Sequence, residues 1–72
     1  MRNFDDAQGN RWQATMLEAS YGTALVIFSR MGSDEVLKNT LDAVNLIDAE
    51  KLLAELDEAG LRATLDGAVP WS

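Results

Sequence analysis

Five consecutive apolar residues within the segment TALVIFSR constrain the fold of this chain more than any other feature. The run is too short to cross a membrane and has the length of a buried strand. Because a strand alternates its side chains, Ala24, Val26 and Phe28 point one way, and Leu25 and Ile27 point the other. Both faces of this strand are therefore apolar, and both need cover.

The length of the chain limits how many other elements can bury these two faces. Its 72 residues suit one small domain, and a domain of this size buries only about 60% of the surface that its unfolded form exposes. The chain has no Cys and no His, which excludes disulfides, thiolate metal sites and the commonest near-neutral general base. Of the usual supports for a small core, self-association remains.

Charge is distributed unevenly along the chain. The net charge is −6, with four basic against five acidic residues in 1–41 and two against seven in 42–72. Such an acidic surface repels phosphate groups, so we expect no binding to nucleic acid or to membranes. Acidity suits a basic protein partner, and it also simply keeps a small protein in solution.

No apolar segment indicates export or membrane insertion. The start, MRNFDDAQ, lacks the apolar core of a signal peptide, and no later run approaches about 18 apolar residues. With 47% hydrophobic and 25% charged residues, the composition is that of an ordinary globular protein. We therefore expect a cytoplasmic location.

Alternating apolar residues between turn signals predict an antiparallel β-meander of three to four strands. Asp6 and Gly9 begin and end the first turn, and Leu17 and Glu18 break the alternation of the second strand. Asn39 falls among apolar positions, which a bulge or an edge position would accommodate. The expected strands cover residues 1–5, 10–19, 23–29 and 35–43.

The pattern changes to helical spacing after residue 44. A leucine stripe predicts one amphipathic helix from about Asn45, its N-cap, to Ala59. Gly60 is the expected stop, with Leu56 and Leu61 in contact as in a Schellman motif. The stripe consists of Leu46, Ala49, Leu53 and Leu56, widened by Leu52 and Ala59.

The last residues carry one further helical signal and then a tail. Leu61 and Leu65 lie four apart, so Arg62–Asp66 can form a short second helix that ends at Gly67. Pro70 then favours an extended tail. The resulting fold class is α+β: a single small domain, 1–72, in which the meander packs against the C-terminal amphipathic helix.

The second apolar face of residues 24–28 would remain uncovered by that helix. Three elements can cover it: the returning tail with Trp71, a strongly curled sheet, or another copy of the chain. Trp12 and Phe28 fall on the predicted core face. For Tyr21 in a turn and Trp71 in the tail, core cover and partner contact stay open.

No constellation of residues favours catalysis or a bound cofactor. The sequence from Asp5 fails the calcium-loop pattern, because its alternate positions Ala7 and Gly9 offer no side-chain oxygen. The helix acids fall on the water-facing side, and the serines lack a His or Cys partner. No phosphate-binding glycine motif occurs. We expect a protein that is not an enzyme, with no metal and no cofactor.

Several short motifs together resemble those of a group of small uncharacterised bacterial proteins. They are DAQGNRW at 6–12, EASYG at 18–22, Phe-Ser at 28–29, Asn45 before the acidic helix, and Pro-Trp at 70–71. The resemblance extends over nearly the whole chain. It implies a bacterial setting, but no mechanism and no residue roles.

The function expected from these patterns is that of a small cytoplasmic non-catalytic interaction protein. Its partner is another protein or itself, and a homodimer through the sheet would bury the second apolar face. One alternative is an acidic adaptor or inhibitor that docks on a basic protein surface; another is a small-molecule binder with a pocket between sheet and helix. The partner-facing candidates are Tyr21, Leu25, Ile27, Trp71, Glu50, Glu55 and Glu58.

Overall fold

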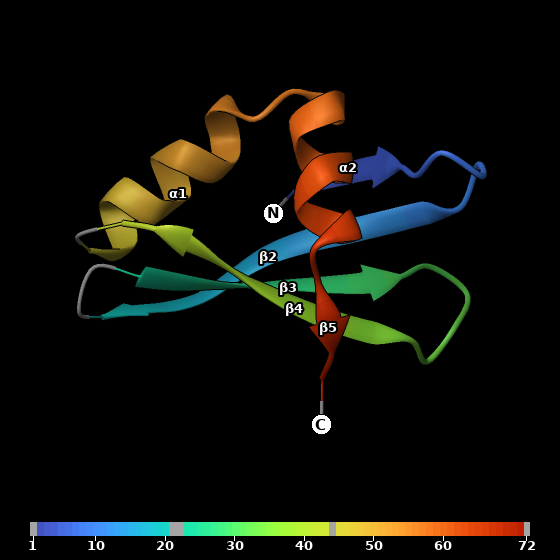
Figure 1. The fold of residues 1–72 in the computed structure, drawn as a ribbon, viewed down its shortest axis with the longest axis horizontal. Coiled ribbons are helices and arrows are strands. Elements are labelled where there is room, and N and C mark those ends of the chain that lie inside the picture. Colours follow the sequence, from blue (N-terminus) through green and yellow to red (C-terminus); the bar gives the residue numbers. More distant parts are fainter. Residues whose placement is uncertain (1, 21–22, 44, 72) are drawn as a thin grey trace.

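The computed structural model describes residues 2–20, 23–43 and 45–71. Within them, five antiparallel strands form one sheet in the order β1-β2-β3-β4-β5, and two helices lie on the same side of it (Figure 1). The α+β fold class with an antiparallel sheet is thus confirmed. The elements are β1 (Arg2–Asp5), β2 (Arg11–Ser20), β3 (Thr23–Arg30), β4 (Val36–Asp42), α1 (Leu46–Glu55), α2 (Glu58–Asp66) and β5 (Val69–Pro70).

The first four strands form the predicted meander, with ends within one residue of those expected from the sequence. The break in alternation near Leu17 is a register shift: Met16 pairs with Val26, but Glu18 pairs with Leu25. A β-bulge thus lies in β2 rather than at Asn39. Gly9, with φ of +86°, ends the first turn in a conformation that favours glycine. The predicted turn residues Tyr21 and Gly22 lie outside the described residues.

The core lies between the sheet and the two helices. Val26 and Phe28 of β3 are fully buried there, and Phe28 meets Phe4 edge to face with ring centroids 6.0 Å apart. Leu53 of α1 and Leu61 of α2 complete the same cluster. Trp12 is also buried, which confirms the core placement predicted for Trp12 and Phe28.

The prediction of one helix up to Ala59 is wrong. The first helix ends at Glu55, Leu56 is extended, and Asp57 starts a second helix by accepting a hydrogen bond from the backbone N–H of Gly60 at 2.7 Å. Asp57 is a strong N-cap residue, and this cap competes with continuation of α1. The second helix is therefore nine residues long rather than a single turn.

Gly60 lies inside α2 and does not stop a helix, so the predicted Schellman motif is also wrong. A Cβ atom at Gly60 would lie 2.9 Å from Cδ2 of Leu56. A side chain at this position would therefore have to displace the end of the Leu56 side chain, and the backbone of Gly60 does not require a positive φ. The other predicted helix ends are confirmed: Asn45 accepts the N–H of Asp48 at 2.8 Å, and Gly67 ends α2.

The C-terminal tail is extended as predicted, but it also adds a fifth strand that the sequence did not indicate. Val69 pairs with Lys38, Pro70 pairs with Leu37, and the N–H of Trp71 donates to the carbonyl of Val36 at 2.9 Å. The strand number is thus five rather than three to four among the described residues. The tail joins the edge of the sheet instead of folding across its second face.

Candidate interaction surface

The side of the sheet away from the helices carries an apolar patch, which we call the open face. Strand alternation and register place its members together: Ile27 pairs with Lys38, and Lys38 pairs with Val69. Val69 is 53% exposed and Trp71 is 47% exposed. The patch consists of Leu25, Ile27, Val36, Val69 and Trp71, with Lys38 among them.

Two of the predicted partner-facing residues, Leu25 and Ile27, lie in the middle of the open face. Both are half-buried, because neighbouring side chains on the sheet cover part of their surface. Trp71 belongs to the same face but lies at its edge, where the Nζ of Lys38 is 5.4 Å from the ring centroid. The tail therefore leaves the centre of the open face available. Tyr21 lies outside the described residues.

The open face is nearly neutral, in contrast to the helix layer on the other side. The polar side chains around the patch are mostly uncharged, as in Gln13, Thr15, Ser29 and Thr40. Lys38 and Asp42 have opposite charges on the same strand. The helix layer, residues 46–66, holds six acidic residues against Lys51 and Arg62, so most of the net charge of −6 lies there.

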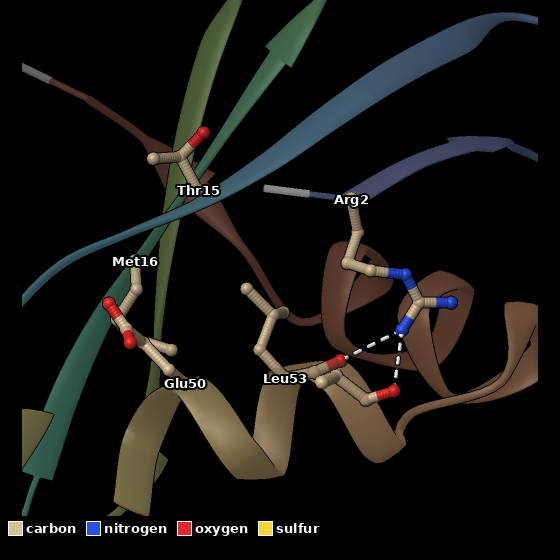
Figure 2. A pocket seen from close by; sticks show the side chains of 6 residues that line it. Arg2, Thr15, Met16, Glu50 and Leu53 are labelled. Atoms are coloured by element: carbon tan, nitrogen blue, oxygen red, sulfur yellow. Dashed lines mark hydrogen bonds between the residues drawn. The ribbon is translucent and has the colours of Figure 1, made fainter. Parts of the chain in front are cut away.

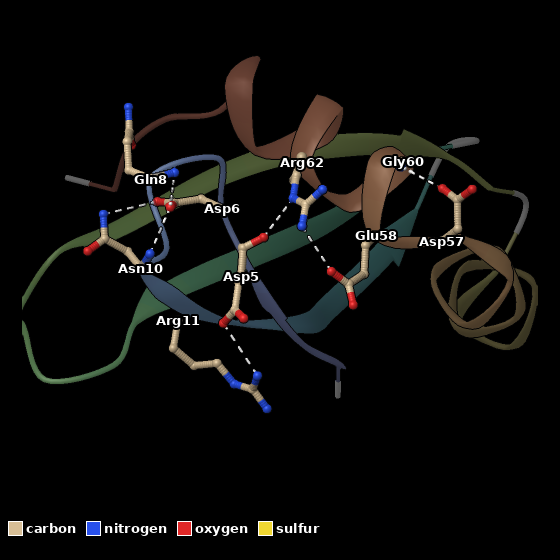
Figure 3. Close-up of polar contacts among 9 residues, drawn as sticks. All are labelled: Asp5, Asp6, Gln8, Asn10, Arg11, Asp57, Glu58, Gly60 and Arg62. Carbon is tan, nitrogen blue, oxygen red and sulfur yellow. Dashed lines mark hydrogen bonds and ion pairs between the residues drawn. The ribbon is translucent and has the colours of Figure 1, made fainter.

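Both edges of the sheet have their backbone groups partly occupied. On the β1 side, Nε of Arg62 donates to the carbonyl of Asp5 at 2.7 Å (Figure 3). On the other side, Pro70 has no N–H to offer, and the N–H of Thr40 donates to Oδ1 of Asn39 at 2.8 Å. Such devices disfavour the addition of a further strand at an edge. The open face is thus better suited to docking than the edges.

Asn39 has a role that sequence reasoning missed. It lies on the helix-facing side of β4 just beyond the residues that pair with β5, so the predicted edge position is correct. Its Nδ2 donates to the carbonyl of Thr64 in α2 at 2.8 Å. The sequence did carry a signal for this hydrogen bond: a polar residue at an apolar position of an edge strand needs a partner, and a helix packed on that side can supply it.

The three predicted glutamates do not form a single patch. All three are exposed, but Glu50 and Glu55 are five positions apart on α1 and so point about 140° away from each other around its axis. Glu58 lies on α2 and forms an ion pair with Arg62 at 3.0 Å (Figure 3). A basic partner would meet a spread of charge here rather than a focused site.

The first turn is organised by the carboxylate of Asp6. It accepts backbone N–H groups of Gln8 and Asn10 at 2.9 and 2.8 Å (Figure 3), and the indole N–H of Trp12 at 2.8 Å. The hydrogen bond from Trp12 is the main cause that lowers the pKa of Asp6 from 3.8 to about 2; the N–H groups act the same way, against partial desolvation. Asp6 therefore holds a turn, and within the described residues no group of acids could hold a metal ion.

A surface hollow of about 360 Å³ lies between β1, β2 and α1 (Figure 2). The guanidinium of Arg2 is turned to the end of α1, where Nη1 donates to the carbonyls of Leu53, Ala54 and Leu56 at 3.0, 3.0 and 2.9 Å. Glu50 stands at the margin with Met16 and Thr15. Ligand sites usually measure about 300–1,000 Å³, so the volume of this hollow is near the lower end of that range.

Comparison with known protein families, with functionally described proteins and with solved structures gives no match to this chain. Among the helices of the described residues, none has the length and apolar content needed to cross a bilayer. The surfaces of the chain differ clearly in chemistry: an apolar neutral face, two partly occupied edges, and an acidic helix layer.

Proposed function

We propose that this protein is a non-catalytic interaction module that binds a protein partner on the open face of its sheet. The observation that carries the proposal is the apolar patch on the side opposite both helices, where Val69 and Trp71 keep about half of their surface exposed. Exposed apolar patches on small proteins mark interaction sites, and aromatic residues are enriched in them.

The chemistry of the chain supports a binding role over a catalytic one. The sequence contains no His and no Cys, the residues that most often act as general base or nucleophile near neutral pH. Asp6 has a perturbed pKa, but its carboxylate is occupied by the N–H groups of the turn. The lowered pKa thus reflects a structural role.

The acidic helix layer supports a second candidate function, docking on a basic protein. Six acidic residues in 46–66 favour such a partner, although Glu58 is already paired with Arg62. The two functions differ in their response to salt. Binding through the open face should change little with ionic strength, whereas docking through the acids should weaken as salt is added.

A comparison of two matched variants tests the proposed function. Ile27→Lys places a charge at the centre of the open face, and Ile47→Lys places the same charge on α1, where Ile47 is 81% exposed. We expect proteins retained by the wild-type chain to be lost with Ile27→Lys and kept with Ile47→Lys, at low and high salt alike. Equal retention by all three proteins would contradict the proposal.

A further inference from the structure

We propose that the partner on the open face is a second copy of this chain, packed sheet against sheet in a two-fold dimer. The inference rests on the proposed function, because both use the same face. Its centre is formed by Leu25 and Ile27, with Val69 and Trp71 at one side. In an isologous interface, each copy presents the same patch to the other.

The distribution of charge favours this arrangement over contact through the helices. Each copy carries a net charge of −6, and most of it lies in the helix layer. Two helix layers in contact would bring like charges together, which is unfavourable. Contact through the open faces leaves both acidic layers on the outside, separated by the two sheets.

The few charges on the open face are compatible with self-association. Lys38 and Asp42 lie on the same side of β4, four positions apart, with opposite charge. Asp5 and Arg11 pair with each other at 3.4 Å at the far corner. A two-fold arrangement can set Lys38 of one copy opposite Asp42 of the other, so these two opposite charges can pair between the copies.

The edges of the sheet leave few open backbone groups for pairing between copies. Pro70 lacks an N–H, and Asn39 and Arg62 occupy backbone groups at opposite edges. Face-to-face packing needs no free edge, because sheets stack about 10 Å apart through their side chains. With the helix layers and edges disfavoured, the open face is the surface on which two copies fit.

The size of the open face indicates a dimer that dissociates on dilution. Strand β3 has eight residues, and at about 3.3 Å per residue it is about 26 Å long. The five strands, spaced about 4.8 Å apart, extend about 19 Å across it. Even with every strand counted at full length, this footprint of about 500 Å² lies below the roughly 800 Å² per partner that specific interfaces usually bury, so association should be weak.

Sedimentation equilibrium between about one micromolar and about one millimolar tests the dimer directly. We expect the mass of the wild-type chain to rise with concentration from 7.9 kDa toward twice that value. Ile27→Lys should remain at 7.9 kDa, and the matched variant Ile47→Lys should associate like wild type. A mass of 7.9 kDa for wild type at every concentration would overturn the dimer.

A second variant guards against misfolding of Ile27→Lys. Val69→Lys alters the rim of the patch, where the side chain is 53% exposed and contributes little to folding. Circular dichroism should match wild type, and the mass should stay at that of one chain. If Ile47→Lys abolishes association while both open-face variants retain it, the interface lies in the helix layer and the proposed face is wrong.

The fluorescence of Trp71 supplies an independent readout. Trp12 is buried and Trp71 is half-exposed, so an aqueous quencher should reach mainly Trp71. We expect quenching to decrease as wild-type concentration rises and to stay constant for Val69→Lys. Quenching that is independent of concentration in wild type would count against the dimer.

These results separate failure of the dimer from failure of the proposed function. A wild-type chain that is monomeric throughout, but loses a retained protein when Ile27 is changed, overturns self-association alone. If Ile27→Lys changes neither association nor retention, the open face binds nothing and both proposals fall.

Discussion

The two faces of β3 consist of neighbouring residues from one apolar run, but the helices lie over only one of them (Figure 1). Val26 and Phe28 are fully buried beneath the helices, whereas Leu25 and Ile27 keep part of their surface exposed. Hydrophobicity is similar on both faces. The difference teaches that the apolar pattern of β3 alone does not distinguish its two sides, and that the helices bury only one of them.

Polar residues attach the helices to that one side. Arg2 of β1 donates to carbonyls at the end of α1, which has no basic residue in its last turn. Asn39 of β4 donates to the carbonyl of Thr64 in α2. On the open face, the corresponding polar residues Arg11 and Lys38 meet Asp5 and Trp71 within the sheet itself, and so bind no second layer.

The largest expected difference between the two faces is in core packing. Phe28→Ala should lower the free energy of unfolding by about 3–5 kcal/mol, because it removes a buried ring and leaves a cavity. Its neighbour Ile27→Ala should lower it by only about 1 kcal/mol, since that side chain is only partly buried. Urea unfolding measures both. Equal losses would show that the two faces are not energetically distinct.

If the Phe28→Ala chain does not fold, its loss of stability is larger than urea unfolding can measure, and this too supports a greater contribution of the core face. Val26→Ala then provides the quantitative value for the core face, with an expected loss of about 2 kcal/mol. It should still exceed the loss for Ile27→Ala.

The next effect concerns attachment of α1. Arg2→Ala should lower the free energy of unfolding by about 1.5 kcal/mol, because three carbonyls lose a charged donor. Arg11→Ala, on the open-face side, removes only an exposed ion pair and should change it by less than about 0.5 kcal/mol. Amide hydrogen exchange should show that the lost stability of Arg2→Ala is concentrated in α1. A similar effect of both substitutions would weaken the role assigned to Arg2.

A smaller effect is expected at the start of α2. Asp57→Ala removes the N-cap and should lower the free energy of unfolding by about 1 kcal/mol. Asp66, at the opposite end of α2, faces the negative end of the helix dipole, so Asp66→Ala should leave stability unchanged or slightly raised. If Asp57→Ala is neutral, the cap does not separate the two helices.

The smallest effect is confined to acidic pH. The pKa of Asp6 in the folded chain is about 2, below the ordinary 3.8, so its ionised form favours folding. This contribution is complete above pH 3.8 and is lost as pH falls toward 2. Asp6→Asn should flatten the acid-induced fall in stability in that window. Asp34→Asn, at an exposed loop position, serves as the control and should behave like wild type.

Much of the sheet could be predicted from the sequence because its signals are local. Alternation, the Asp6–Gly9 turn and the break near Leu17 each depend on residues a few positions apart. The open-face residues Leu25 and Ile27 followed from alternation alone. Trp12 as a partner of Asp6 was missed, although an indole N–H at a core position needs an acceptor and Asp6 lies just across the turn.

The helices show where local signals fail. The leucine stripe continues through Leu56, so periodicity alone favours one helix over two. What separates them is the extended backbone at Leu56 together with the Asp57 cap, and Leu56 packs against the core cluster that Leu53 and Leu61 share with the sheet. The fifth strand was missed for a related reason, since Val69 and Pro70 make a strand only by lying beside β4.

By itself, the sequence determined the strand positions, the first turn, the Asn45 cap and the two apolar faces of β3. Only the tertiary structure decided that two helices form instead of one, that the tail adds a fifth strand, and that Arg2 and Asn39 join the helices to the sheet. The physical reason is distance along the chain: local patterns act over a few residues, whereas the contact from Arg2 to Leu53 joins residues 51 positions apart. Such contacts exist only once the chain has folded.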